Sequence, residues 1–128
     1  MAIKISDLSV GDWVLNHRDY PTKVQVITTE GNLFLGELDA KPEHCTHLWV
    51  QDIKPVPITA EILENNGFER LLDRDLFYHS ESGLEVAFED GEWEHTINLH
   101  EYTIHTISGV HHVQHLLRFY GFDKEINL

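Results

Sequence analysis

The segment Pro57–Phe68, PITAEILENNGF, constrains the fold more than any other stretch, because it is a short helix signal between two β-rich halves. Its proline cannot continue a strand ladder, and Thr59 is placed to cap the first helical turn with its hydroxyl. Asn66-Gly67 is typical of a helix end, since glycine adopts the left-handed conformation at little cost. We expect a helix of about two turns, which packing must hold. We also expect Phe68 to fold back over its last turn.

Residues 1–57 contain five short runs of β-forming residues separated by turn residues: 13–16, 23–29, 33–38, 47–51 and 53–56. Five strands in so short a segment favour a small barrel, because closure leaves little unpaired strand edge. The layout resembles SH3-like barrels of the KOW/Tudor type. The resemblance rests on GDWV at the first strand, the long hairpin after it, and LWVQDIKPV at the last two strands.

Residues 58–128 predict a second domain, in which an antiparallel meander follows the short helix. Leu84, Val86 and Phe88 alternate with polar residues, which is typical of a strand with one wet face. Asp90-Gly91 then predicts a tight hairpin. A final helix is expected over residues 110–120, where apolar residues recur at helical spacing. The expected fold class is α+β: a small SH3-like β-barrel followed by an antiparallel β-meander packed with two helices.

The charge of the chain is strongly negative and unevenly distributed. The formal net charge is −13; residues 1–58 carry eight Asp/Glu and five Lys/Arg, and residues 59–128 carry fourteen and four. Such a surface repels phosphate backbones and offers no counterion release on nucleic acid. Direct binding of DNA or RNA is therefore not expected. Acidity serves solubility in many proteins, and here it is also compatible with a basic protein partner or with mimicry of DNA.

Compartment and membrane association follow from other simple features. No apolar run is long enough to cross a bilayer, and the first twelve residues contain no apolar core of a signal peptide. Cys45 is the single cysteine, so no internal disulfide framework exists, which fits a reducing environment. We expect a cytoplasmic protein with no membrane contact. The sequence leaves its oligomeric state open.

Two motifs carry a second resemblance. IKPVPITAEILENNGFE and VHHVQHLLRFYGFDKEINL together resemble a family of small uncharacterised proteins encoded on prophages and mobile elements of gut anaerobic bacteria. The shared patterns are PIxxTxEIL…GF in the middle of the chain and VHxxQxL…G at its end. His112 and His115 fall where the family pattern has Gln and Asn, and Asn66 replaces its Cys. The resemblance implies a genomic setting and a fold pattern, but no activity.

Histidines are the residues that best fit a metal site. The chain has ten of them. His111 and His115 are four apart on the expected final helix, so they share a face and could bind one divalent transition metal, with His105 or His79 as a third ligand. The alternative is that these imidazoles line the polar side of the helix or form hydrogen bonds. The helix lacks the Glu of HExxH, which argues against a metalloprotease.

Acidic and aromatic residues suggest two interaction surfaces. Glu85, Glu89, Glu92 and Glu94 are expected on the outer faces of two adjacent strands, as solvated charge. The aromatic set Trp13, Tyr20 and Trp49 could form a groove for cations or proline-rich peptides, as in Tudor-like and SH3-like binders. The competing interpretation places Trp13 and Trp49 in the barrel core.

We therefore expect a non-enzymatic accessory or interaction protein of a phage or mobile element, acting through a protein partner. No pattern of catalytic residues and no cofactor motif is present in the sequence. Two alternatives stay open. One is a metal-binding protein or metal-dependent hydrolase that uses the C-terminal histidines. The other is an acidic inhibitor that mimics DNA against a host DNA-binding protein.

Overall fold

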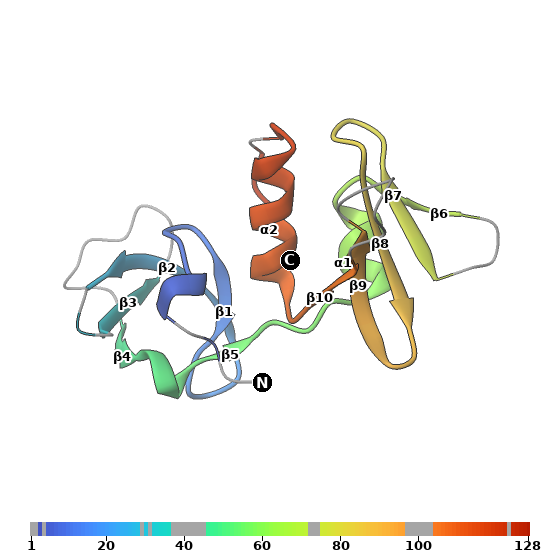
Figure 1. The fold of residues 1–128 in the computed structure, drawn as a ribbon. Coiled ribbons are helices and arrows are strands. Elements are labelled where there is room, and N and C mark those ends of the chain that lie inside the picture. The colour runs from blue at the N-terminus through green and yellow to red at the C-terminus, as the bar shows by residue number, and fades with distance from the viewer. Residues whose placement is uncertain are drawn as a thin grey trace. The chain divides into compact units, whose positions relative to one another are not determined.

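The structure is a computed structural model that describes residues 3, 5–28, 30, 32–36, 46–71, 75–96, 104–122 and 124–128. It divides into two compact units, Met1–Pro57 and Ile58–Leu128. Both units are built on antiparallel sheets, and the two α-helices belong to the second, so the fold class is α+β. Figure 1 shows the strands of each unit and the two helices.

The first unit contains one five-stranded antiparallel sheet with the order β4-β3-β2-β1-β5. Among the described residues, 3-10 turns lie at Ile5–Asp7 and at Val50–Asp52 between β4 and β5. The strands are β1 (Trp13–Leu15), β2 (Pro21–Ile27), β3 (Asn32–Gly36), β4 (Thr46–Trp49) and β5 (Lys54–Pro55). Each of the five predicted runs therefore contains a strand, although positions 50 and 51 of the fourth run belong to the 3-10 turn. In the part of the unit that the structure describes, the sheet is open, with β4 and β5 at its edges.

Aliphatic side chains form the core of the first unit. The strand alternation explains it, because every second residue of β2 and β3 faces the same side. Val14, Val24 and Leu33 are fully buried there. They belong to a cluster with four other buried aliphatic residues: Ile3, Leu8, Leu35 and Ile53.

The second unit opens with α1 (Ala60–Asn65), whose caps are the expected ones. The Thr59 hydroxyl accepts from the backbone N–H of Ile62 at 3.1 Å, and Asn66 ends the helix. Gly67 follows with φ +89°, which confirms the predicted left-handed turn. Phe68, which was expected to fold back over the last turn of α1, is buried and begins a strand, in which it pairs with His79.

The second sheet has the order β10-β9-β8-β7-β6, so it is a simple meander. Asp90 and Gly91 have φ angles of +53° and +81° and form the two-residue turn between β8 and β9, as predicted. The strands are β6 (Phe68–Arg70), β7 (Leu76–His79), β8 (Leu84–Glu89), β9 (Glu92–Thr96) and β10 (Ile104–Ile107). After them, α2 (Val110–Phe119) is the predicted final helix.

We call the buried side of the second sheet its inner face, and the opposite side its outer face. Phe77, Leu84 and Val86 lie on the inner face and are almost fully buried. The helix α2 packs on this face: the Tyr120 hydroxyl at its end lies 3.3 Å from Nε2 of His95 in β9. One side of the meander is therefore covered and the other is left to solvent. No helix in the described part of the chain is long and apolar enough to cross a membrane.

Candidate functional site

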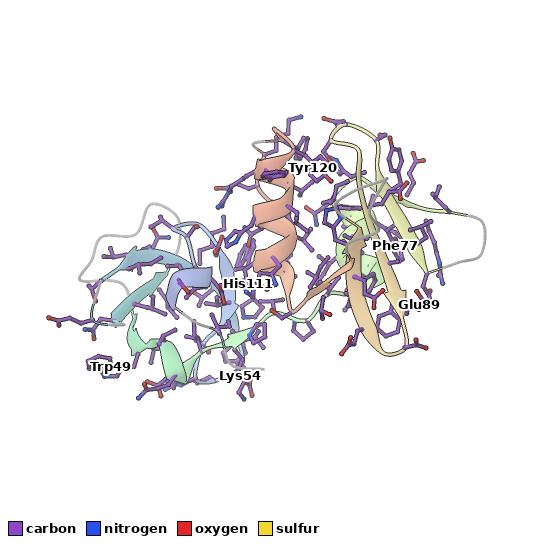
Figure 2. All side chains as sticks on the ribbon, viewed as in Figure 1. Trp49, Lys54, Phe77, Glu89, His111 and Tyr120 are labelled. Carbon is purple, nitrogen blue, oxygen red and sulfur yellow. The ribbon has the colours of Figure 1, made fainter. Side chains whose placement is uncertain are left out.

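Four glutamates of β8 and β9 lie together on the outer face of the second sheet. Residues paired across antiparallel strands share a face, and Glu89 is paired with Glu92 while Ala87 is paired with Glu94. Glu85 and Glu89 share that side because they are four residues apart in one strand, where side chains alternate with a period of two. Three of them, Glu85, Glu89 and Glu92, are exposed, and Glu94 is half-buried. Figure 2 shows Glu89 near the turn of the β8–β9 hairpin.

Two further residues of this face were not predicted. Glu69 in β6 is paired with Tyr78 in β7, and Tyr78 is paired with Glu85. All three therefore share one face, and Glu69 is exposed. Glu69 was not predicted, because β6 has one apolar residue followed by two charged ones and so shows no alternation that would indicate a strand. We call Glu69, Glu85, Glu89, Glu92 and Glu94 the carboxylate face.

The carboxylate face places like charges beside one another. Glu89 and Glu92 are directly opposite across the hairpin, an arrangement that typically costs a few tenths to about 1 kcal/mol. No lysine or arginine belongs to the outer face among the described residues of β6 to β10; Arg70 is paired with Phe77, an inner-face residue. Arg70 instead forms an ion pair with Asp75. The free energy gained by packing on the inner face must therefore offset the repulsion between the carboxylates of the outer face.

The inner face contains two buried histidines with opposite hydrogen-bond patterns. His79 accepts: its Nδ1 receives the backbone N–H of Ser82 at 3.2 Å and lies 2.8 Å from the Ser82 hydroxyl. His95 donates from Nδ1 to the carbonyl oxygen of Glu85 at 3.0 Å, and its Nε2 accepts from Tyr120. Burial lowers the pKa of His79 below its ordinary value of 6.5, and the nearby carboxylate of Glu81 opposes that shift. Both rings therefore serve the fold as hydrogen-bonded core groups.

The predicted metal ligands are only partly described. The rings of His111 and His115 lie 6.1 Å apart on α2, and His111 is almost fully buried. His105 is paired with His95 in the β9–β10 ladder, but its side chain lies outside the described residues. Within the described ranges, no three His, Cys, Asp or Glu side chains are grouped as a metal would require. The proposed third ligand His79 is engaged through Nδ1 by Ser82.

His112, between the two predicted ligands, has a local structural role. Its Nδ1 accepts the backbone N–H of Ser108 at 3.0 Å, just before α2 begins. The first amides of a helix and of its approach lack helical partners, so such a bond helps to define where the helix starts. His112 therefore fixes the backbone just before the first turn of α2.

The three aromatic residues predicted to form a groove have different environments. Tyr20 is 65% exposed and Trp49 is 45% exposed, so the core interpretation of Trp49 was wrong. Trp49 precedes the 3-10 turn Val50–Asp52, which leaves its side chain at the end of β4 (Figure 2). Trp13 is half-buried, and the ammonium group of Lys23 lies 4.9 Å from its ring centre. A lysine of the chain itself therefore occupies the cation-binding face of Trp13.

Comparisons with family models, with curated proteins and with solved structures found no match for this chain.

Proposed function

We propose that the protein is a non-enzymatic interaction protein that binds a basic protein partner through the carboxylate face. One observation carries the proposal: five glutamates from β6, β8 and β9 share one face of a sheet, and no basic side chain accompanies them within the described residues of that face. A surface whose charges serve only solubility needs a moderate charge density and can carry both signs. A single-sign surface on a rigid sheet steers an oppositely charged partner and orients it.

The biological setting that we propose follows from the resemblance to proteins of prophages and mobile elements. In that setting the protein acts in the host cytoplasm on a host protein. A basic partner that normally binds DNA would make the carboxylate face an inhibitor that mimics phosphates, and this is the form of the proposal in which competition with DNA is expected.

We also propose that the first unit is an SH3-like barrel. Its strand order, β4-β3-β2-β1-β5, and the 3-10 turn Val50–Asp52 between β4 and β5 support this assignment. The exposed side chains of Tyr20 and Trp49 would then be its contribution to partner binding, as aromatic residues are in other small barrels.

A metal-binding protein or metal-dependent hydrolase is the second candidate, supported by the 6.1 Å separation of the His111 and His115 rings. It would require His105 or another group as a third ligand. Metal analysis of the purified protein tests it directly. A stoichiometric transition metal that is lost in the His115→Asn variant would support this candidate and would contradict a non-metal role of α2.

The experiment for the carboxylate face uses two variants with the same change in net charge. The face variant replaces Glu85, Glu89 and Glu92 by Gln, and the control variant replaces Glu30, Glu61 and Glu64 by Gln. All six glutamates are exposed, and the control residues lie outside the second sheet. Each protein is immobilised and used to capture partners from host lysate, at low salt and at about 1 M salt, where charge interactions are screened within about 3 Å.

The proposal predicts that the wild-type and control proteins retain the same partner at low salt, whereas the face variant and high salt release it. Addition of DNA separates the two forms of the proposal, because only a DNA mimic is displaced from its partner by duplex DNA. Equal loss in the face and control variants would show that net charge alone governs capture. Equal capture by all three proteins would exclude the carboxylate face as the interface.

A further inference from the structure

The second unit contains a cavity on its covered side, away from the carboxylate face. Its volume is about 210 Å³, and its walls come from the end of α1, the turn after β7, α2 and the C-terminal tail. On this measure about 10–15 Å³ is enough for one water molecule, so the cavity has room for a small ligand.

His79 provides a buried polar group in the wall of this cavity. The residue is 1% exposed, and its ring packs against Phe68 and Phe122, with ring centres 4.9 and 4.4 Å away. Its Nδ1 accepts the N–H of Ser82, so the neutral ring holds its proton on Nε2. Ser82 is not part of the cavity wall, whereas Gly67, on the Nε2 side, is. His79 therefore presents a hydrogen-bond donor toward the cavity.

Gly67 keeps the approach to that donor open. A Cβ atom at this position would lie 3.3 Å from Nε2 of His79, closer than most real contacts, and the backbone φ of +89° also disfavours any side chain. The helix end requires the left-handed conformation, and the same absence of a side chain leaves room beside the imidazole. Gly67 thus allows the left-handed turn at the end of α1 and also leaves space beside the His79 ring.

The chain's own C-terminal tail forms the opposite wall, and Asn66 holds it in place. The Asn66 side chain pairs with Asn127 in the way a peptide group would: its Oδ1 accepts the Asn127 N–H at 2.7 Å, and its Nδ2 donates to the Asn127 carbonyl at 2.8 Å. Nδ2 also donates to the carbonyl of Ile62 in α1 at 2.7 Å. Ile126 is buried beside it. These hydrogen bonds fix the C-terminal tail against α1, so this wall of the cavity is held in a defined position.

Charged groups of both signs border the cavity. Glu81 and Glu125 contribute carboxylates, and Lys124 contributes an ammonium group that lies 5.9 Å from the ring centre of Phe122. Leu117, Phe122 and Ile126 supply apolar surface. The lining therefore combines acceptors for a cation, donors for a carboxylate and a small apolar wall.

We propose that this cavity binds a free α-amino acid with a small apolar side chain. In this arrangement the ligand's ammonium group pairs with Glu81 or Glu125, and its carboxylate accepts from Lys124 and from Nε2–H of His79. Its side chain lies against Phe122, Leu117 and Ile126. A ligand with only one of the two charges makes fewer of these charge-assisted hydrogen bonds and is expected to bind more weakly.

Nuclear magnetic resonance titration of the full chain tests this assignment, with valine, n-butylamine and butyrate as probes. Each probe is added to about 10 mM, well above a weak millimolar Kd. We expect valine to shift the backbone amide resonances of Gly67, His79 and Phe122, and the single-charge probes to bind at least about tenfold more weakly, since one charged hydrogen bond contributes about 1.5–3 kcal/mol.

Matched variants connect the binding to the cavity. Glu81→Gln and Lys124→Gln both change exposed residues of the lining, and Glu89→Gln removes one exposed carboxylate from the outer face instead. The first two are expected to weaken valine binding by about tenfold, and the third to leave it unchanged. The proposal is overturned if no probe shifts the cavity resonances, if n-butylamine binds as well as valine, or if Glu89→Gln weakens valine binding as much as Glu81→Gln does.

Discussion

The two sheets of this protein have the same strand number and pairing type but bury different chemistry. The first unit has an aliphatic core, and its one buried polar side chain among the described residues is Asp12. Asp12 accepts the N–H of Ser9 at 2.7 Å, a bond within one turn of the chain. The second unit buries four polar side chains within the described residues: His79, His95, His111 and Gln114.

This difference indicates two ways of making a small β-rich unit stable. Aliphatic packing depends on shape and on area removed from water, and it is insensitive to protonation. Buried imidazoles need specific hydrogen bonds, so the second unit depends on partners such as Ser82 and Tyr120 and on the protonation state of the rings. The second unit also carries most of the negative charge, fourteen Asp/Glu against four Lys/Arg in residues 59–128. The two units should therefore respond differently to mutation and to pH.

The largest effect is expected for Phe77→Ala in the second sheet. Phe77 is 1% exposed and packs against Trp93 at 5.6 Å between ring centres. Truncation of a buried phenylalanine typically lowers the free energy of unfolding by about 3–5 kcal/mol. Urea denaturation followed by circular dichroism measures the change. Phe88→Ala is the matched control, because Phe88 lies on the same face and also contacts Trp93 but is 40% exposed, and a comparable loss there would contradict the expectation that burial sets the size of the effect.

Leu33→Ala is the corresponding change in the first sheet. Leu33 is fully buried in the aliphatic cluster, so we expect a loss of about 2–5 kcal/mol in the free energy of unfolding. Because no titratable group is removed, the loss should be the same at pH 5.5 and at pH 7.5. A strongly pH-dependent loss would show that the first unit also relies on charge and would weaken the comparison.

His111→Ala is expected to have an intermediate effect. His111 is 1% exposed on α2, and removal of a buried polar ring costs about 1–3 kcal/mol. His115→Asn, at a half-buried position on the same helix, should change the free energy of unfolding by less than about 0.5 kcal/mol. Thermal denaturation of both variants, with and without a chelator, measures these values. A chelator effect that disappears in His115→Asn would instead reveal a metal site.

The smallest effect is a pH dependence that originates at His79. Burial lowers the pKa of His79 in the folded state below 6.5, so the unfolded chain binds more protons in the window between the two pKa values. The stability contributed by the neutral ring is therefore present above pH 6.5 and is lost as the pH falls. One such group changes the free energy of unfolding by at most about 1.4 kcal/mol per pH unit. Comparison of wild-type and His79→Gln unfolding between pH 7.5 and pH 5 measures it, and identical slopes would contradict a neutral, desolvated His79.

Local signals in the sequence determined most of the secondary structure. Thr59, Asn66 and Gly67 define α1 because capping depends on backbone groups within one turn. Asp90-Gly91 defines the β8–β9 hairpin because its two φ angles must be positive. The alternation of β8 also indicated which side of that strand would carry Glu85 and Glu89. These features depend on residues close together in the chain, so a single sequence contains them.

Only the tertiary structure decided which residues from distant segments meet. Strand β6 exists because Phe68 and Glu69 pair with His79 and Tyr78, and that pairing added Glu69 to the carboxylate face. The bonds between Asn66 and Asn127 join residues sixty-one positions apart and shape the cavity beside His79. The exposure of Trp49 follows from the 3-10 turn after it, whereas its large apolar side chain had favoured a place in the core. Long-range pairings of this kind depend on the combined packing of many side chains, and no local pattern in the sequence encodes them.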